Sequence, residues 1–129
     1  MHKCVVIADD LTGGNATGVM ISGYGYDTYA VINRDDIDLN NMPECDCIIY
    51  PTNSRSVDSK TAYDAVFSAT EFFKNDEVVV YSKRIDTTLR GNLGSETDAM
   101  LDALNNDAIA MVVPCAPQAE RVTVGGYVL

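Results

Sequence analysis

The stretch that decides the fold is residues 77–96, which read EVVVYSKRIDTTLRGNLGSE. Its first part, residues 77–81, is short and rich in β-branched residues, which predicts a buried strand. Charged and hydroxyl side chains follow, and Gly91 allows the backbone to turn before a helix. Asn92 stands where it can cap that helix, whose apolar residues recur at helical spacing: Leu93, Met100, Leu101 and Leu104. The stretch therefore predicts a strand, a polar turn and a helix.

The polar turn is rich in charge, with the cations Lys83, Arg84 and Arg90 and the carboxylate of Asp86. Free N–H groups and the positive end of the helix dipole favour a carboxylate or a phosphate at such a turn. An arginine can also hold a carboxylate through two parallel hydrogen bonds. We therefore expect an anion to bind at this turn.

Similar units lie on both sides of this stretch. Further apolar runs predict strands at residues 3–8, 27–32, 46–50 and 108–113. One helical pattern follows a loop at residues 9–14 and runs through Val19 and Met20 to Gly23, and another covers residues 58–74. Unbroken apolar strands separated by helices are typical of a parallel sheet covered on both faces. We predict an α/β fold with three α/β/α layers, a mainly parallel central sheet and a Rossmann-like arrangement.

Length and composition fit one soluble domain. The chain has 129 residues, of which 47% are hydrophobic and 22% charged, and these values are typical of a single globular domain with its own core. We expect one domain over residues 1–129. Residues 122–129 look like a turn and a strand begun at the very end, so we expect the chain to be cut inside a larger protein.

The charge distribution favours a small anionic ligand. A net charge of -10 argues against a nucleic-acid or anionic-membrane partner, since either requires a basic face. Five of the nine cations nevertheless fall at predicted strand exits: Arg55, Lys83, Arg84, Arg90 and Arg121. An acidic protein that concentrates positive charge there is expected to bind a small anion.

Cysteine usage and apolar stretches bear on the compartment. The four cysteines contain no C-x-x-C pair and His2 is the one histidine, so no zinc site is expected. No signal peptide is present, and no apolar stretch approaches the roughly 18 residues that span a membrane. We therefore expect a cytoplasmic protein with reduced thiols.

Polar clusters follow four of the predicted strands. In open parallel sheets, ligands bind at the carboxyl ends of the strands. The clusters contain Asp9, Asp10 and Thr12; Asn53, Ser54 and Arg55; residues 83–92; and residues 114–121. Arginine and lysine would bind a carboxylate, whereas Asp, Asn and Ser would bind hydroxyls. Together the clusters predict a pocket for a small polyhydroxylated anion.

Nucleotide-binding motifs do not fit. Gly13, Gly14 and Gly18 lack the G-x-G-x-x-G spacing, and no Walker A loop is present. A phosphoacceptor receiver domain would need a third aspartate where Tyr50 and Pro51 stand, and residues 9–12 do not match D-x-D-x-T. The aspartate pair at residues 9–10 could bind magnesium or cap the helix that follows, and the sequence leaves both open.

Four motifs, in order along the chain, resemble the N-terminal domain of the four-carbon acid sugar kinases, the family also called DUF1537. They are ADDLTGGNATG (residues 8–18), NSR (53–55), KRIDTTLRGN (83–92) and a tail with Arg121, Gly125 and Gly126. The resemblance implies an N-terminal domain that binds threonate, erythronate or a 3-oxo-tetronate. A separate C-terminal domain would bind ATP with Mg²⁺, and the terminal hydroxyl of the sugar acid would be phosphorylated between the two.

The resemblance also implies roles for single residues. Arg90, Lys83 and Arg55 would hold the carboxylate or balance charge near the transferred phosphate. Hydroxyls of the substrate would be bound by Asp9, Asp10, Asn53, Ser54 and Asp86, and Gly91 and Asn92 complete the expected substrate site. Asp86 or Asp10 would be the base that orients the attacking hydroxyl, and the sequence does not choose between them. No residue of this chain is expected to bind ATP.

The chain lacks the second domain, so we expect it to be inactive alone, with a sugar acid and the ATP-binding domain as its partners. A homo-oligomer is also compatible with the sequence.

One departure from the family pattern is Ala16, which stands where relatives usually have an aspartate. The alternative hypothesis is a stand-alone sugar-acid-binding module without catalysis. An exposed apolar patch where a second domain could dock would favour the kinase.

Overall fold

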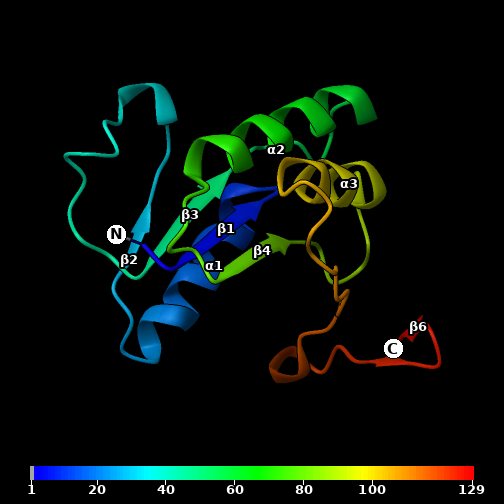
Figure 1. The fold of residues 1–129 in the computed structure, drawn as a ribbon. Coiled ribbons are helices and arrows are strands. Elements are labelled where there is room, and N and C mark those ends of the chain that lie inside the picture. The colour runs from blue at the N-terminus through cyan, green and yellow to red at the C-terminus, as the bar shows by residue number, and fades with distance from the viewer. Residues whose placement is uncertain (1) are drawn as a thin grey trace.

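The computed structural model describes residues 2–129. Its main sheet has four parallel strands in the order β2-β3-β1-β4 (Figure 1). The strands are β1 (Cys4–Ala8), β2 (Thr28–Ala30), β3 (Cys47–Pro51) and β4 (Val80–Arg84), and the helices are α1 (Leu11–Gly23), α2 (Ser59–Phe73) and α3 (Leu93–Ala103). Helices α2 and α3 cover one face of the sheet and α1 covers the other. The predicted three-layer α/β fold with a parallel sheet is confirmed.

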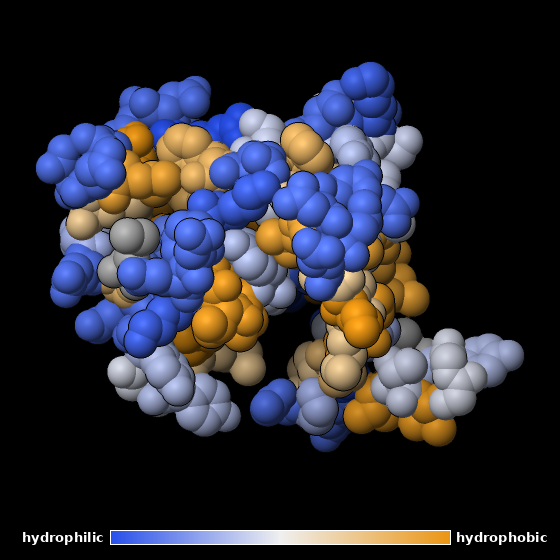
Figure 2. Space-filling view, viewed as in Figure 1, coloured by the Kyte–Doolittle hydropathy of each residue, from blue (hydrophilic) through white to orange (hydrophobic). Residues whose placement is uncertain are grey.

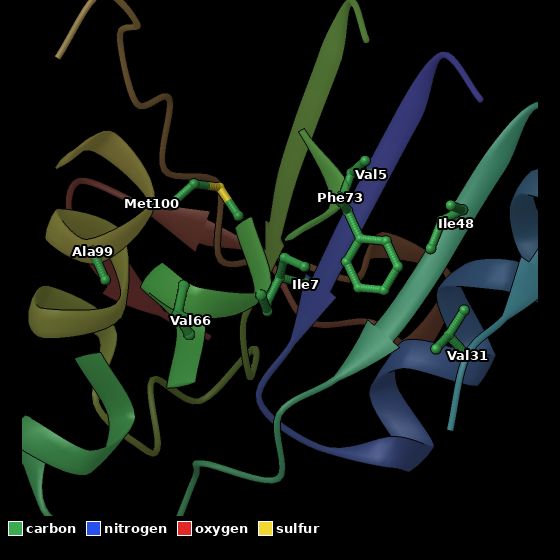
Figure 3. Packing of buried hydrophobic residues seen from close by; sticks show 9 residues of the cluster. Val5, Ile7, Val31, Ile48, Val66, Phe73, Ala99 and Met100 are labelled. Carbon is green, nitrogen blue, oxygen red and sulfur yellow. The ribbon is translucent and has the colours of Figure 1, made fainter. Parts of the chain in front are cut away.

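The main core lies between the sheet and the helices α2 and α3. Val5, Ile7 and Ile48 point from the strands toward Phe73 of α2 and Met100 of α3 (Figure 3). Phe73 is fully buried, and burying a side chain of this kind stabilises the fold by roughly 1.5–3 kcal/mol. The apolar residues whose spacing predicted a helix at residues 58–74 therefore form the face of α2 that packs on the sheet.

Helix α1 packs closely on the opposite face of the sheet because of two glycines. A Cβ on Gly14 would lie 3.1 Å from the Cβ of Ala8, and one on Gly18 would lie 3.2 Å from Ile49. Both distances are shorter than ordinary contacts, so larger residues would push the helix away from β1 and β3. This approach fixes the start of α1 beside the carboxyl end of β1.

Strand β4 begins three residues later than the sequence indicated. The apolar run predicted a strand at residues 77–81, but pairing with β1 covers Val80 to Arg84, with Ala8 opposite Arg84. Backbone hydrogen bonds do not depend on side-chain polarity, so the ladder continues through the polar residues. Val79, just before the strand, is 78% exposed. Because the strand is shifted, Lys83 and Arg84 lie within it and point to opposite faces of the sheet.

The strand predicted at residues 108–113 is absent from the part of the chain that the structure describes. These residues belong to a C-terminal arm, residues 105–129, that leaves the body after α3 (Figure 1). The left-handed backbone of Asn105 and Asn106 ends the helix. Ile109 is 97% exposed and Met111 88% exposed, and Figure 2 shows apolar surface along the arm. The prediction was wrong because an apolar run forms a strand only where another strand pairs with it.

The arm ends in a short hairpin. Strands β5 (Thr123–Val124) and β6 (Tyr127–Val128) pair in antiparallel fashion across Gly125 and Gly126, which both have positive φ. The predicted turn at residues 122–129 is thus confirmed. Among residues 2–129, no helix combines the length and the apolar character needed to cross a membrane.

Candidate functional site

The exits of β1 and β3 are joined by a buried ion pair. Asp9 follows β1 and is 2% exposed, and Arg55 follows β3. The Arg55 Nε donates to Asp9 Oδ2 at 2.7 Å and Nη2 donates to Oδ1 at 3.0 Å. The same Nη2 lies 3.0 Å from Asp10 Oδ1. The hydrogen bond with Asp9 raises the pKa of Arg55 above its usual range.

Asp10 caps helix α1. Its Oδ1 accepts a hydrogen bond from the backbone N–H of Gly13 at 3.0 Å, which confirms the capping interpretation of this residue. A Cβ on Gly13 would lie 2.5 Å from that oxygen, so a larger residue there would displace the capping carboxylate. Within residues 2–129, no group of three His, Cys, Asp or Glu side chains is placed to hold a metal ion.

The turn after β4 holds a second Asp–Arg pair. Asp86 is buried and accepts hydrogen bonds from Arg90 Nε at 2.7 Å, Arg90 Nη2 at 3.0 Å and Thr88 Oγ1 at 2.5 Å. The Arg90 guanidinium, with help from Thr88, holds the pKa of Asp86 well below its usual range despite burial. Asp86 is therefore ionised at neutral pH and is a poor proton acceptor while Arg90 stays in place.

Gly91 brings the two pairs together. It has a φ of 98°, and a Cβ at this position would lie 3.4 Å from both Arg55 Cγ and Asp9 Oδ2. The turn after β4 thus rests on the Asp9–Arg55 pair. The predicted site residues from β1, β3 and β4 meet at one edge of the sheet, as their strand exits indicated.

Lys83 lies in a different environment from the one predicted. Its side chain is 8% exposed, and its Nζ lies 2.7 Å from Glu96 Oε2 in α3. The Ser54 hydroxyl donates to the other Glu96 oxygen. These three side chains form a buried network, defined here as the Lys83–Glu96–Ser54 network, that ties the two strand exits to α3. The polar groups of Lys83 and Ser54 are therefore already paired with Glu96 in this structure.

Glu96 is the residue of this network that sequence reasoning missed. The sequence could have indicated its burial, because Glu96 lies three residues after Leu93 and four before Met100, on the predicted apolar face of the helix. A carboxylate on a buried face requires a partner. Lys83 is that partner.

The two predicted asparagines have different environments. The Asn92 side chain donates to the backbone carbonyls of Ser54 and Val57 at 3.0 and 2.9 Å. It therefore fixes the loop after β3 and makes no capping hydrogen bond to α3, contrary to the prediction. Asn53 is exposed and has a left-handed backbone with a φ of 53°.

Two further observations locate the site. The C-terminal arm returns to it through Arg121, whose Nη1 donates to Thr87 Oγ1 at 3.1 Å. Two surface hollows lie elsewhere, one between α1 and the strands β2 and β3, the other at the opposite edge of the sheet around Lys3 and Asp46. The Asp–Arg pairs line neither of these hollows.

Comparison with known proteins places the chain in a family. A model of the family described as the sugar-binding N-terminal domain matches residues 4–129. D-erythronate kinase of Heliobacterium modesticaldum is 46% identical over 100% of this chain and 29% of its own length. D-threonate kinase of Salmonella typhimurium is 31% identical over 98% of this chain and 29% of its own length. The chain thus spans about a third or less of these relatives.

Solved structures agree with this assignment. A DUF1537 protein from Bordetella bronchiseptica, a domain-swapped dimer with bound citrate, superposes with a TM-score of 0.89 at 28% identity. The superposition covers 99% of this chain and 33% of that one. The resemblance seen in the four sequence motifs is therefore confirmed, and the chain belongs to the family of sugar-binding N-terminal domains found in the four-carbon acid sugar kinases (DUF1537).

Proposed function

We propose that this chain is the substrate-binding part of an ATP-dependent kinase that phosphorylates the terminal hydroxyl of a four-carbon sugar acid. The observation that carries the proposal is the meeting of the Asp9–Arg55 and Asp86–Arg90 pairs at the carboxyl edge of the sheet. Carboxylates bind hydroxyls and arginines bind carboxylates, so the two pairs match the two kinds of group in a sugar acid. Relatives named D-erythronate and D-threonate kinase support this substrate class.

Arg90 is the residue that we propose for the substrate carboxylate. Its side chain is 67% exposed, whereas that of Arg55 is 20% exposed and held by two aspartates. Because most of the Arg90 side chain is exposed, a substrate carboxylate can reach its guanidinium while the buried Asp86 stays paired with it. Asp86 would also accept hydrogen bonds from substrate hydroxyls.

Asp10 is the residue that we propose as the base. Asp86 accepts four hydrogen bonds from Thr88 and Arg90, and these favour its ionised form. Asp10 is 29% exposed, and only its Oδ1 is engaged, by the Gly13 N–H and by Arg55 Nη2 at 3.0 Å. Phosphoryl transfer depends mostly on positioning, so the base needs only to orient the hydroxyl and take its proton.

ATP and Mg²⁺ belong, in this proposal, to a domain outside the chain. The described residues do not fit a Mg²⁺ ion, because both aspartates after β1 are paired with Arg55 and no three metal-ligating side chains converge in residues 2–129. The exposed apolar side chains of the arm support a partner over the alternative of a module that works alone.

We also propose a homo-oligomer in which residues 108–113 of one copy pair with the free edge of β4 in another. The edge is open, since β4 ends the sheet and Val80 is 51% exposed. The domain-swapped relative from Bordetella bronchiseptica superposes over 99% of this chain, which supports exchange between copies. The ATP-binding domain is the rival occupant of this surface.

The kinase proposal is tested with the longer protein that contains this chain. The protein is incubated with ATP and Mg²⁺ and, separately, D-threonate, D-erythronate and a 3-oxo-tetronate, and phosphorus NMR follows the product. We expect a phosphate ester with at least one acid and none with D-threitol, which lacks the carboxylate. Binding of an acid without any ester from the longer protein would instead favour the binding module.

A further inference from the structure

Arg84 is a cation at the carboxyl edge to which the proposed function gives no role. It ends β4 opposite Ala8. Because side chains alternate along a strand, Lys83 lies on the α3 side of the sheet and Arg84 on the α1 side. Its guanidinium lies beside Gly13 in the first turn of α1, where a Cβ would be 3.1 Å from Arg84 Cζ and 3.2 Å from Nη2.

Arg84 differs from its neighbours because it has no carboxylate partner in residues 2–129. Arg55, Lys83 and Arg90 are all paired with aspartate or glutamate. The Nη1 of Arg84, in contrast, is buried from solvent and has no hydrogen-bond partner. Buried donors of charged groups are rarely left unpaired in folded proteins, since the loss of hydration is costly. An unpaired guanidinium nitrogen is therefore a place where an anion would be stabilised.

Arg84 is only partly buried, so part of its side chain is accessible to an anion. The carboxylate of Asp10 borders the same point beside Gly13 as Arg84 does. An anion carried by a hydroxyl held at Asp10 would therefore lie next to the Arg84 guanidinium.

We propose that Arg84 binds the phosphate group of the phosphorylated sugar acid, with its partner-free guanidinium beside Asp10. This inference rests on the proposed function, since Asp10 is there the residue that holds the reacting hydroxyl. Arg90 binds the carboxylate of the same molecule, and Asp86 binds its hydroxyls. Arginine suits this position because its planar guanidinium matches a phosphate through two parallel hydrogen bonds.

Calorimetric titration of the 129-residue chain tests this division of roles. The ligands are a four-carbon sugar acid, its terminal phosphate ester and inorganic phosphate. We expect Arg84→Met to weaken ester binding about 10- to 100-fold, the range for a charged hydrogen-bonding group, and to leave acid binding within about twofold. Methionine retains the apolar stem, and circular dichroism checks the fold. Lys3→Met removes one charge from an exposed residue at the amino end of β1, the end opposite the site, and is expected to change neither affinity.

The titrations distinguish failure of the phosphate role of Arg84 from failure of the proposed sugar-acid binding. Equal loss of acid and ester affinity in Arg84→Met, or no loss of either, overturns the phosphate role and leaves the proposed function intact. If the unmodified chain binds neither acid nor ester but binds inorganic phosphate in a way that Arg84→Met removes, the phosphate site stands and the sugar-acid proposal fails. Partial recovery in Arg84→Lys, which keeps the charge but not the planar fork, supports the phosphate role.

Discussion

Replacement of Lys83 by methionine tests whether this lysine serves stability or substrate binding. In the structure the Lys83 side chain is 8% exposed and that of Glu96 is 2% exposed, with 2.7 Å between Nζ and Oε2. Removing one partner of a buried ion pair leaves the other charge buried without compensation, which typically costs 3–5 kcal/mol. We therefore expect Lys83→Met to lower the free energy of unfolding by about 3–5 kcal/mol.

The double variant keeps this prediction testable if the single variant unfolds. Lys83→Met with Glu96→Met replaces the pair by apolar side chains, and such replacements are often neutral or stabilising. We expect the double variant to recover most of the loss, with Ser54 then lacking its acceptor. Urea denaturation followed by circular dichroism gives the free energies.

The matched control is the exposed pair Lys60–Asp64, whose side chains are 82% and 58% exposed. Lys60→Met removes a lysine of the same kind from a surface ion pair and is expected to change stability by less than about 1 kcal/mol. A Lys83→Met chain as stable as Lys60→Met, with sugar-acid affinity lost, would refute the structural role and restore Lys83 as a ligand-binding residue.

Three further predictions follow from local geometry. Gly13→Ala puts a Cβ 2.5 Å from the capping carboxylate oxygen of α1, so we expect a loss of roughly 1–3 kcal/mol in thermal or urea unfolding; unchanged stability would contradict the cap. Asp86 has a lowered pKa in the folded chain, so its contribution to stability is present above the unfolded value of about 3.9 and is lost as pH falls. Arg90→Met should shrink the difference in stability between pH 7 and pH 3, and an unchanged difference would exclude Arg90 as the cause. Ile109→Asp should convert the proposed oligomer to a monomer, as measured by light scattering. If the unmodified chain is itself a monomer, the ATP-binding domain is favoured as the partner that binds the arm.

Much of the fold could be predicted because its signals are local. The apolar run at residues 3–8 and the helical spacing at residues 58–74 correspond to β1 and α2 with shifts of at most one residue at each end. The exits of β1, β3 and β4 were placed at one edge because parallel strands share their direction. The meeting of Asp9 with Arg55 follows from that rule, although the two are 46 residues apart.

The remaining features depend on partners that a local pattern does not contain. Pairing with β1 decides where β4 begins, and the three-residue shift decides that Lys83 points to α3 and Arg84 to α1. Residues 108–113 have the composition of a strand but no strand beside them in residues 2–129. The sequence pattern placed charged residues at the strand exits and did not show which charges neutralise one another.

The central claim is that this chain binds a four-carbon sugar acid through the Asp–Arg pairs at the carboxyl edge of its sheet. Calorimetric titration of the folded chain with D-threonate, D-erythronate and a 3-oxo-tetronate tests it most directly, with Arg90→Ala as the variant and Lys60→Ala as the control. The account predicts weak binding of at least one acid that Arg90→Ala abolishes and Lys60→Ala leaves unchanged. Binding that survives Arg90→Ala, or no heat with any acid from a folded sample, would contradict it.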